Sequence, residues 1–345
     1  MKDLPAGMKE RDLAHALAAG WSIPAGSLRY APVGAGSYHW TVGEEPGERR
    51  FVTVDDLDDK GWLGRTRPAV LAGLRAAMGA AVALRRQPGL GFVVAPEPAV
   101  TGETVLPVGG RHAVAVFPFL DGSPGDWSAP LPAPERAELI AMLAALHRAD
   151  PAGVGLPRVE PGLSWRGDLE MALTELGRPW TGGPYAEPAR ELLAGAAGLV
   201  RRELGRLDRW AGRLAGADVV ITHGEPHPGN VIRLPATPAT PVVADGGGPA
   251  GARLALIDWD TVGLAPPERD LWGVATGSGE ELRRYTELTG RPVDAAALEL
   301  YRLRWALDDL SCFVRDLRAP HRRTPGTEDA WADLKSTLTD LAALG

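Results

Sequence analysis

Residues 219–232 read VVITHGEPHPGNVI, and residues 254–260 read LALIDWD. In each segment an apolar run that predicts a short strand leads directly into polar side chains. The polar residues are His223, Glu225 and Asn230 in the first segment and Asp258 in the second. Carboxylate and amide oxygens are suited to orienting a hydroxyl group and to binding Mg²⁺. These two segments carry most of the information about the fold.

The order and spacing of these residues are typical of kinase-like phosphoryl transfer. A kinase catalytic loop supplies an acidic residue and, five residues later, a metal-binding Asn; a second metal-binding Asp follows a later strand. Glu225, Asn230 and Asp258 fit this pattern. The alternative is a turn-forming Asn230 and an Asp258 that only ends a strand.

A zinc site is excluded by two features of the same loop. His-x-Glu occurs in zinc deaminases, but their remaining ligands are a Cys-x-x-Cys pair, and this chain has a single cysteine, Cys312. A helical metalloprotease motif needs a Glu directly beside the first of two His residues. Glu225 is one position too late for that motif, and Pro226 and Pro228 disfavour a helix.

Length and composition predict an ordinary globular protein of two lobes. The chain has 345 residues, 45% hydrophobic and 23% charged. Its net charge of −7 argues against a nucleic-acid partner and is compatible with a cationic small molecule. We expect no membrane span, because no apolar run approaches about 20 residues. The single cysteine excludes an internal disulfide, and a cytoplasmic location is the expectation. The oligomeric state is left open.

The distribution of periodic segments predicts an α+β protein. Strands are expected within five segments, at 28–36, 37–43, 49–56, 103–108 and 111–120, and a long helix at 67–87. Helices are expected at 134–150, 187–216 and 294–317. Residues 235–252, rich in Pro, Gly and Ala, are expected to form a mobile surface insertion. We therefore expect an antiparallel-sheet lobe over 1–120 and a mainly helical lobe over 121–345, the latter holding a catalytic loop at 223–230 and a metal segment at 256–260.

The two opening segments, with the second extended to residue 272, resemble the catalytic and metal segments of the aminoglycoside phosphotransferase family. PVGAGSYHW (32–40) and LAALHRAD (143–150) are similar to its spectinomycin-phosphotransferase branch. The resemblance covers roughly residues 25 to 310. It implies a bilobal protein-kinase-like fold and transfer of the γ-phosphoryl group of ATP or GTP, with Mg²⁺, to a hydroxyl of a small, often cationic antibiotic.

The resemblance also implies roles for the residues of the catalytic and metal segments. His223 would brace the loop, Glu225 would sit at the base position, and Asn230 and Asp258 would hold Mg²⁺. Asp270 would be a structural acid that anchors the loop. His147, on the 134–150 helix, either faces that loop or is a buried, hydrogen-bonded histidine.

A glycine turn and a connector are the expected nucleotide contacts. Glycines let backbone N–H groups approach phosphate oxygens, and the expected contacts are Gly34, Gly36, Ser37, Phe117, Phe119 and Leu120. A plain hairpin turn is the alternative for the glycine segment, because His39 replaces the third glycine of a kinase loop.

A late helix is expected to border the acceptor. Asp308 and Asp309 could bind substrate ammonium groups, with Trp305 nearby, and a solvated helix face is the alternative.

The sequence departs from the kinase pattern at two places. Thr53 occupies the position where the third strand normally presents a lysine to the phosphates, and the 67–87 helix has no acidic partner for such a lysine. Lys60 could reach phosphate from another direction, but four neighbouring aspartates favour a surface ion pair. The second departure is Glu225, which is one methylene longer than Asp; displacements of about 1 Å can cost on the order of 10²-fold in rate. An active kinase and a pseudokinase-like binding protein with little or no transfer are therefore both open.

Overall fold

The computed structural model describes residues 1–24, 28–43, 49–126, 129–214, 216–235, 253–275 and 278–344. Except for Pro235, the expected insertion at 235–252 lies outside the described residues. The described strands are β1 (Arg29–Ala31), β2 (Tyr38–Val42), β3 (Arg50–Asp56), β4 (Leu106–Val108), β5 (His112–Pro118), β6 (Ser123–Pro124), β7 (Val220–Thr222), β8 (Val231–Leu234), β9 (Arg253–Leu256) and β10 (Gly263–Ala265). The described α-helices are α1 (Glu10–Trp21), α2 (Arg67–Arg85), α3 (Ala133–His147), α4 (Arg166–Thr174), α5 (Ala186–Ala211), α6 (Glu268–Leu271), α7 (Glu280–Thr289), α8 (Ala295–Arg318) and α9 (Pro325–Ala343).

The N-terminal part is an antiparallel sheet with strand order β1-β2-β3-β5-β4. Each of its strands lies within one of the segments expected from the sequence. Helix α1 was not expected. Its Leu13 and Leu17, one helical turn apart, are buried against Val52 and Val54 of β3 and so cover one face of the sheet.

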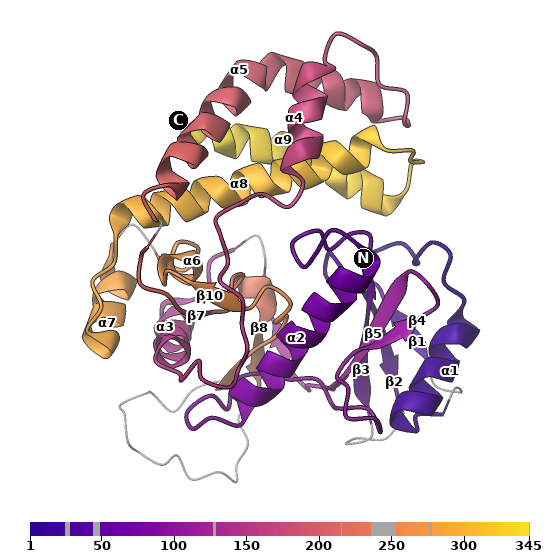
Figure 1. Cartoon of the computed structure of the whole chain (residues 1–345), viewed down its shortest axis with the longest axis vertical. Coiled ribbons are helices and arrows are strands. Elements are labelled where there is room, and N and C mark those ends of the chain that lie inside the picture. Colours follow the sequence, from indigo (N-terminus) through magenta and orange to yellow (C-terminus); the bar gives the residue numbers. More distant parts are fainter. Residues whose placement is uncertain are drawn as a thin grey trace.

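Helix α2 begins at a strong local signal and packs in two places. The Thr66 hydroxyl accepts a hydrogen bond from the N–H of Ala69, and a proline occupies the first turn. Leu74 packs against the sheet, whereas Leu84 is buried in a second core that includes Leu143 and Leu256. Helix α2 therefore joins the sheet to the C-terminal part (Figure 1).

Helix α2 also qualifies the expectation that the chain has no membrane span. Its length and composition alone are those of a helix that could cross a membrane. Its apolar side chains are buried in two protein cores, Val70 and Leu74 in one and Leu84 in the other, which is the ordinary reason for an apolar helix.

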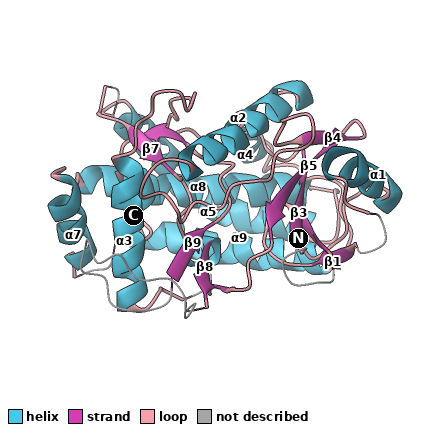
Figure 2. Ribbon diagram, turned by 90° about the horizontal axis from the view of Figure 1, so that it is seen from below, coloured by secondary structure: helices cyan, strands magenta, loops and turns pink. Residues whose placement is uncertain are grey.

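The C-terminal part contains two separate cores. One lies around α3, α7 and the short strands β7 to β10. The other is formed by α4, α5, α8 and α9, which make a helical layer at the top of Figure 1. In Figure 2 this layer lies behind two separate groups of strands, β1–β5 and β8–β9. Helix α8 is capped by Asp294 and buries an apolar stripe at three- and four-residue spacing: Leu300, Leu303, Leu307, Leu310, Val314 and Leu317.

Candidate active site

The pairing of β8 with β9 brings the two opening segments together. Val231 lies opposite Leu256 in this antiparallel ladder. One residue beyond that pair, the N–H of Ile257 donates a hydrogen bond to the carbonyl of Asn230 at 3.0 Å. Asp258 follows immediately. The structure therefore places the two expected metal-binding residues at the same end of one ladder.

The side chain of Asn230 is held with its oxygen available. Its Nδ2 donates to the carbonyl of Glu225 at 2.9 Å and lies 3.0 Å from Nε2 of His227. In the described part of the chain, Oδ1 makes no hydrogen bond. Because an amide oxygen is a suitable ligand for a hard cation, Asn230 fits a Mg²⁺ site.

Asp258 has an uncommon backbone conformation and an exposed side chain. Its φ of 66° lies in the left-handed region, which Asp tolerates better than most residues and which is concentrated at functional sites. Close surrounding protein and the nearby Asp260 carboxylate raise the pKa of Asp258, while Lys60 opposes the shift. A cation bound here would relieve the repulsion between the two carboxylates.

This donor set fits Mg²⁺ better than a metal held by protein alone. Among the described residues, no cluster of three or more His, Cys, Asp or Glu side chains could hold a metal ion by itself. Magnesium is usually bound by one or two carboxylates together with substrate phosphates. Asn230 and Asp258 would hold such an ion.

His223 braces the catalytic loop. Its buried ring places Nε2 2.8 Å from the carbonyl of Ile257, and Nδ1 accepts from the N–H of Glu225 at 3.2 Å. The ring also packs edge-on against Trp259, with centroids 4.6 Å apart. Burial lowers the pKa of His223, so the ring is neutral and both nitrogens are occupied. This agrees with a bracing role and excludes His223 as the proton acceptor.

Asp270 anchors the loop from below, as expected. Its buried carboxylate accepts hydrogen bonds from the backbone N–H groups of His223 at 2.8 Å and Gly224 at 2.7 Å. Nε2 of His147 lies 3.0 Å from the same carboxylate, and Nδ1 lies 2.9 Å from the hydroxyl of Tyr285. His147 is thus buried and hydrogen-bonded, and it reaches the loop only through Asp270.

Gly224 is required where it stands. Its φ is 103°, and a Cβ there would lie 2.4 Å from Nη2 of Arg269 and 2.7 Å from Oγ1 of Thr261. The buried Arg269 side chain itself donates to the carbonyl of Thr261 at 2.8 Å and cannot move freely. Arg269 and Thr261 therefore leave no room for a side chain at position 224, directly before Glu225.

The carboxylate of Glu225 is partly buried and carries an altered pKa. Burial, reinforced by the charge of Asp260, raises the pKa of Glu225 to about 7, and Arg304 opposes this. A carboxylate with a pKa near neutral can accept a proton more readily than one with its ordinary value. The carboxylate makes no hydrogen bond or ion pair within the described residues, so it is available to a substrate hydroxyl.

The glycine turn between β1 and β2 has two residues in the left-handed region. Gly34 and Gly36 have φ values of 68° and 81°, and both are exposed between β1 and β2. The buried hydroxyl of Ser37 donates to Oδ1 of Asp55 at 2.6 Å. Contact between this turn and phosphate groups stays a prediction.

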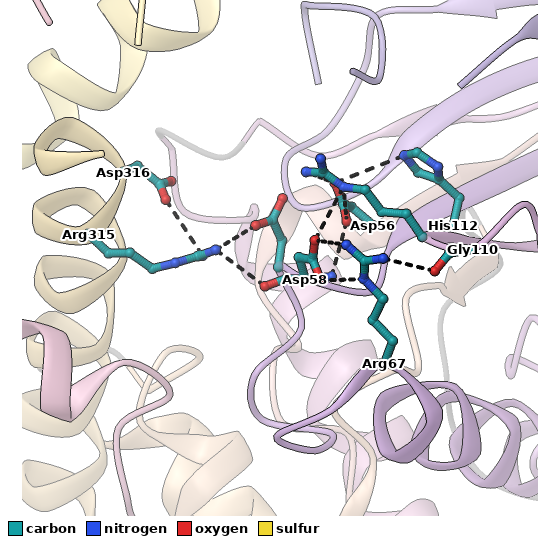
Figure 3. A network of polar contacts seen from close by, with 9 residues as sticks. Asp56, Asp58, Arg67, Gly110, His112, Arg315 and Asp316 are labelled. Atoms are coloured by element: carbon teal, nitrogen blue, oxygen red, sulfur yellow. Dashed lines mark hydrogen bonds and ion pairs between the residues drawn. The ribbon is translucent and has the colours of Figure 1, made fainter. Parts of the chain in front are cut away.

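Lys60 is not the surface ion pair that the sequence favoured. Its side chain is only 3% exposed, and Nζ lies 3.0 Å from Asp55 and 2.5 Å from Asp260. Burial opposes the charge, but Asp260, Asp55 and Asp258 together raise the pKa of Lys60. The aspartates at 56, 58 and 59 are occupied instead by Arg111, Arg67 and Arg315 (Figure 3). Thr53 carries no charge, and its hydroxyl lies 3.3 Å from Nδ1 of His39.

The connector after β5 borders a cavity of about 580 Å³. Phe119 and Leu120 line it, whereas Phe117 lies within β5. The guanidinium of Arg49 lies 4.1 Å from the centre of the Phe119 ring. Neither Glu225 nor Asp258 lines this cavity, and contact of the connector with a nucleotide stays a prediction.

On helix α8 the structure distinguishes the two candidate acids. Asp308 accepts hydrogen bonds from Ser164 N–H at 2.6 Å, Ser164 Oγ at 3.2 Å and Arg304 at 2.8 Å. It holds the Ser164 segment against the helix, and contact of Asp308 with a substrate stays a prediction. Asp309 is partly buried, and burial together with Asp308 and Glu225 raises its pKa to about 7.

Trp305 lies beside the catalytic loop. Its ring lies 6.3 Å from that of His227 and 5.5 Å from that of Trp272. The tryptophan therefore lies against the catalytic loop, and contact with a substrate stays a prediction. The sequence reasoning missed Asp260 and Arg304; a second acid two residues after Asp258 was the only available signal for Asp260.

The profile of the phosphotransferase enzyme family matches residues 27–310 of this chain. The chain belongs to that family. The expected resemblance is thereby confirmed, and so is the expectation of an enzyme. No curated protein sequence matches the chain significantly.

Solved structures show the same fold at low sequence identity. A spectinomycin phosphotransferase in complex with ADP and spectinomycin is 16% identical, with a TM-score of 0.70 and coverage of 98% of this chain and 99% of that one. A microcompartment-associated aminopropanol kinase is 17% identical, with a TM-score of 0.60 and 97% coverage of both chains. A choline kinase from Streptococcus pneumoniae is 14% identical, with a TM-score of 0.53 and coverage of 96% and 99%. The bilobal kinase-like fold is therefore confirmed.

Proposed function

We propose that this protein transfers the γ-phosphoryl group of ATP or GTP, with Mg²⁺, to a hydroxyl of a small aminoglycoside- or aminocyclitol-like compound. One observation carries the proposal. The amide of Asn230 is oriented by Glu225 and His227, and Asp258 directly follows Ile257, whose N–H donates to the carbonyl of Asn230. A protein that only binds a small molecule has no need of this pair.

In the proposed reaction, Glu225 receives a proton. The acceptor hydroxyl oxygen forms a bond to the γ-phosphorus while the bond from that phosphorus to the β–γ bridging oxygen breaks. The nucleoside diphosphate leaves, and the hydroxyl proton passes to the carboxylate of Glu225. Mg²⁺ held by Asn230 and Asp258 would neutralise charge on the phosphates. Because such transition states are largely dissociative, positioning by the loop contributes more than the strength of the base.

The connector supports a position for the nucleotide base. Phe119 and Leu120 line the cavity beside it. Solved relatives contain ADP, AMP or AMP-PNP according to their descriptions, which supports a nucleotide here and leaves ATP and GTP as alternatives.

The acceptor side supports a cationic compound. The charge of Glu225 contributes to the raised pKa of Asp309, and Asp309 makes no ion pair within the described residues. An ammonium group placed there would relieve this repulsion. The structural relatives are named for spectinomycin, aminopropanol and choline, all of which carry a basic or quaternary nitrogen.

A binding protein without transfer is the second candidate. It is favoured by Thr53 at the lysine position and by the lack of any acid in α2. Calorimetric titration with ATP and GTP, with and without Mg²⁺, separates the possibilities. We expect binding that Mg²⁺ strengthens; no binding at millimolar nucleotide contradicts a kinase.

Mass spectrometry then decides between transfer and binding alone. We expect one member of a panel of aminocyclitols, aminoglycosides and amino alcohols to gain a single phosphate in the presence of Mg²⁺ and nucleotide. Asp258→Asn is the matched control and should give no product. Nucleotide binding without product for any acceptor favours the binding protein.

A further inference from the structure

The phosphate side of the N-terminal lobe lacks the ion pair that kinases use. In that pair, a lysine of the third strand contacts the nucleotide phosphates and is held by an acid of the following helix. Thr53 bonds to His39 instead, and α2 contains neither Asp nor Glu. An anionic triphosphate at this place would have no lysine from β3.

Lys60 places an ammonium group where three parts of the site meet. Its Nζ lies 3.0 Å from Asp55 of β3, 2.5 Å from Asp260 of the metal segment and 3.2 Å from Oγ of Ser37 in the glycine turn. These are the elements that enclose the phosphates in a kinase. Lys60 is the only lysine with a buried side chain in the described chain.

The loop that carries Lys60 is tightly packed. Gly61 lies against Trp165, where a Cβ would be 3.0 Å from the indole ring, and Gly64 lies against Ala69, where it would be 2.8 Å away. The N–H of Leu63 closes a turn onto the carbonyl of Lys60 at 3.0 Å. The ammonium position is therefore set by the backbone rather than by a mobile side chain alone.

Arg315 of α8 fixes the same loop from the other lobe. Its Nη2 donates to Oδ1 of Asp59 at 2.8 Å and to the carbonyl of Asp58 at 3.2 Å. Its guanidinium stacks 3.7 Å from the centre of the Trp165 ring. In Figure 3 this side chain extends from α8 to the loop, so α8 holds the residues that directly precede Lys60.

We propose that Lys60 is the phosphate-binding cation of the nucleotide site and that Asp55 takes the place of the missing helix acid. The inference rests on the proposed function. The longest of the three contacts of Nζ is that with Ser37, and a phosphate oxygen would replace it while Asp55 keeps its hold. Three carboxylates, Asp55, Asp258 and Asp260, surround this one ammonium, and the remaining negative charge would be offset by Mg²⁺.

A purely structural ion pair is the competing explanation, and nucleotides of different charge separate the two. Calorimetry would measure the dissociation constants of ATP, ADP and adenosine for the wild type, Lys60→Met and Lys60→Arg. We expect Lys60→Met to weaken ATP and ADP about tenfold or more, because a hydrogen bond to a charged group is lost. Adenosine should change less than twofold, and Lys60→Arg should retain part of the affinity.

Two further variants keep the test decisive. Since Lys60→Met leaves two buried carboxylates unpaired, Lys60→Met with Asp55→Asn replaces it if melting shows a loss of fold. Thr53→Lys in the Lys60→Met background should recover ATP affinity, which a structural pair would not predict. Lys335→Met, on the exposed face of α9, is the control.

The outcome that overturns the inference is equal weakening of ATP and adenosine, or an ATP dissociation constant within twofold of the wild type. A wild type that binds no Mg²⁺-nucleotide would instead overturn the proposed function. The two failures are therefore distinguishable.

Discussion

The two sides of the proposed phosphate site are built in different ways. On the C-terminal side, the catalytic loop and the metal segment keep the order and spacing of the family. Their contacts are local, such as the hydrogen bond that the Asn230 side chain donates to the carbonyl of Glu225, five residues away. On the N-terminal side, the expected lysine is absent from position 53, and Lys60 pairs with Asp260, 200 residues away.

The difference follows from what each side must supply. A metal-binding amide and carboxylate must be set at fixed angles, so the loop that presents them tolerates little change in spacing. A phosphate-binding lysine is a point charge on a flexible four-carbon stem. Such a charge can be delivered from another backbone position, provided that the new position is packed and paired.

The largest effect is expected on the C-terminal side of the site. Asp258→Asn should reduce phosphoryl transfer by about 10³-fold or more, because the carboxylate that would hold Mg²⁺ is lost. Nucleotide affinity measured without Mg²⁺ should change little. Steady-state kinetics and calorimetry check this, and a variant with more than a tenth of wild-type activity contradicts the metal role.

Variants of Glu225 test whether this acid, one methylene longer than Asp, acts as the proton acceptor. Glu225→Ala should lower kcat by about 10²-fold, within the range for loss of a general base, whereas Glu225→Asp should retain or raise it. Full activity in Glu225→Ala would remove Glu225 from the mechanism. Binding of nucleotide should be unaltered in both variants.

The pH dependence of kcat gives a second view of Glu225. Because its pKa is raised to about 7, the carboxylate is protonated below that value and cannot accept a proton. We expect kcat to rise about tenfold between pH 6 and pH 8 and then level off. A profile that is flat over this range would show that Glu225 is not the group that titrates.

Arg315 tests the N-terminal side of the site, because it holds the loop that carries Lys60. Arg315→Ala should raise the KM for ATP by about three- to tenfold with a smaller change in kcat, because Lys60 would be less well positioned. Arg315→Lys should recover only part, since it cannot stack on Trp165 in the same way. Arg302→Ala, on the same helix, is the control. Equal effects of Arg315→Ala and Arg302→Ala on the KM for ATP would show that the contact of Arg315 with the Lys60 loop does not support nucleotide binding.

The smallest effect is expected at the acceptor side. Burial and the charges of Asp308 and Glu225 raise the pKa of Asp309 to about 7, with Arg304 opposing and Asp333 adding slightly. Asp309 is neutral below that pH, so a cationic acceptor should bind about threefold more tightly at pH 8 than at pH 6.

Acceptor titrations without nucleotide measure this dependence. In Asp309→Asn the dependence should become flatter. A wild type whose acceptor affinity is independent of pH would show that Asp309 does not contact the cation. Asp308→Asn should instead lower the melting temperature, because its bonds to Ser164 are lost.

Much of the fold could be predicted from periodicity and turn residues. The strands of the N-terminal sheet, helix α2 and helix α8 all lie where apolar spacing placed them, because burial of one face imposes that spacing. Helix α1 was missed because it is short and its charged residues obscure the apolar pair Leu13 and Leu17. The roles of Asn230 and Asp258 rested on spacing, and their adjacency in the ladder agrees with it.

The sequence by itself determined the family, the kinase-like architecture and the catalytic loop, because these depend on local spacing within strands and turns. Only the tertiary structure decided which charges matter. From its sequence neighbours alone, Lys60 is expected to form a surface ion pair with nearby aspartates. Asp308 and Asp309 are equally good candidates for binding a substrate ammonium group. Packing of β3, the metal segment and α8 buried Lys60 between Asp55 and Asp260 and consumed Asp308. Burial and charge pairing are set by segments far apart in the chain, so the residues beside them in sequence could not reveal them.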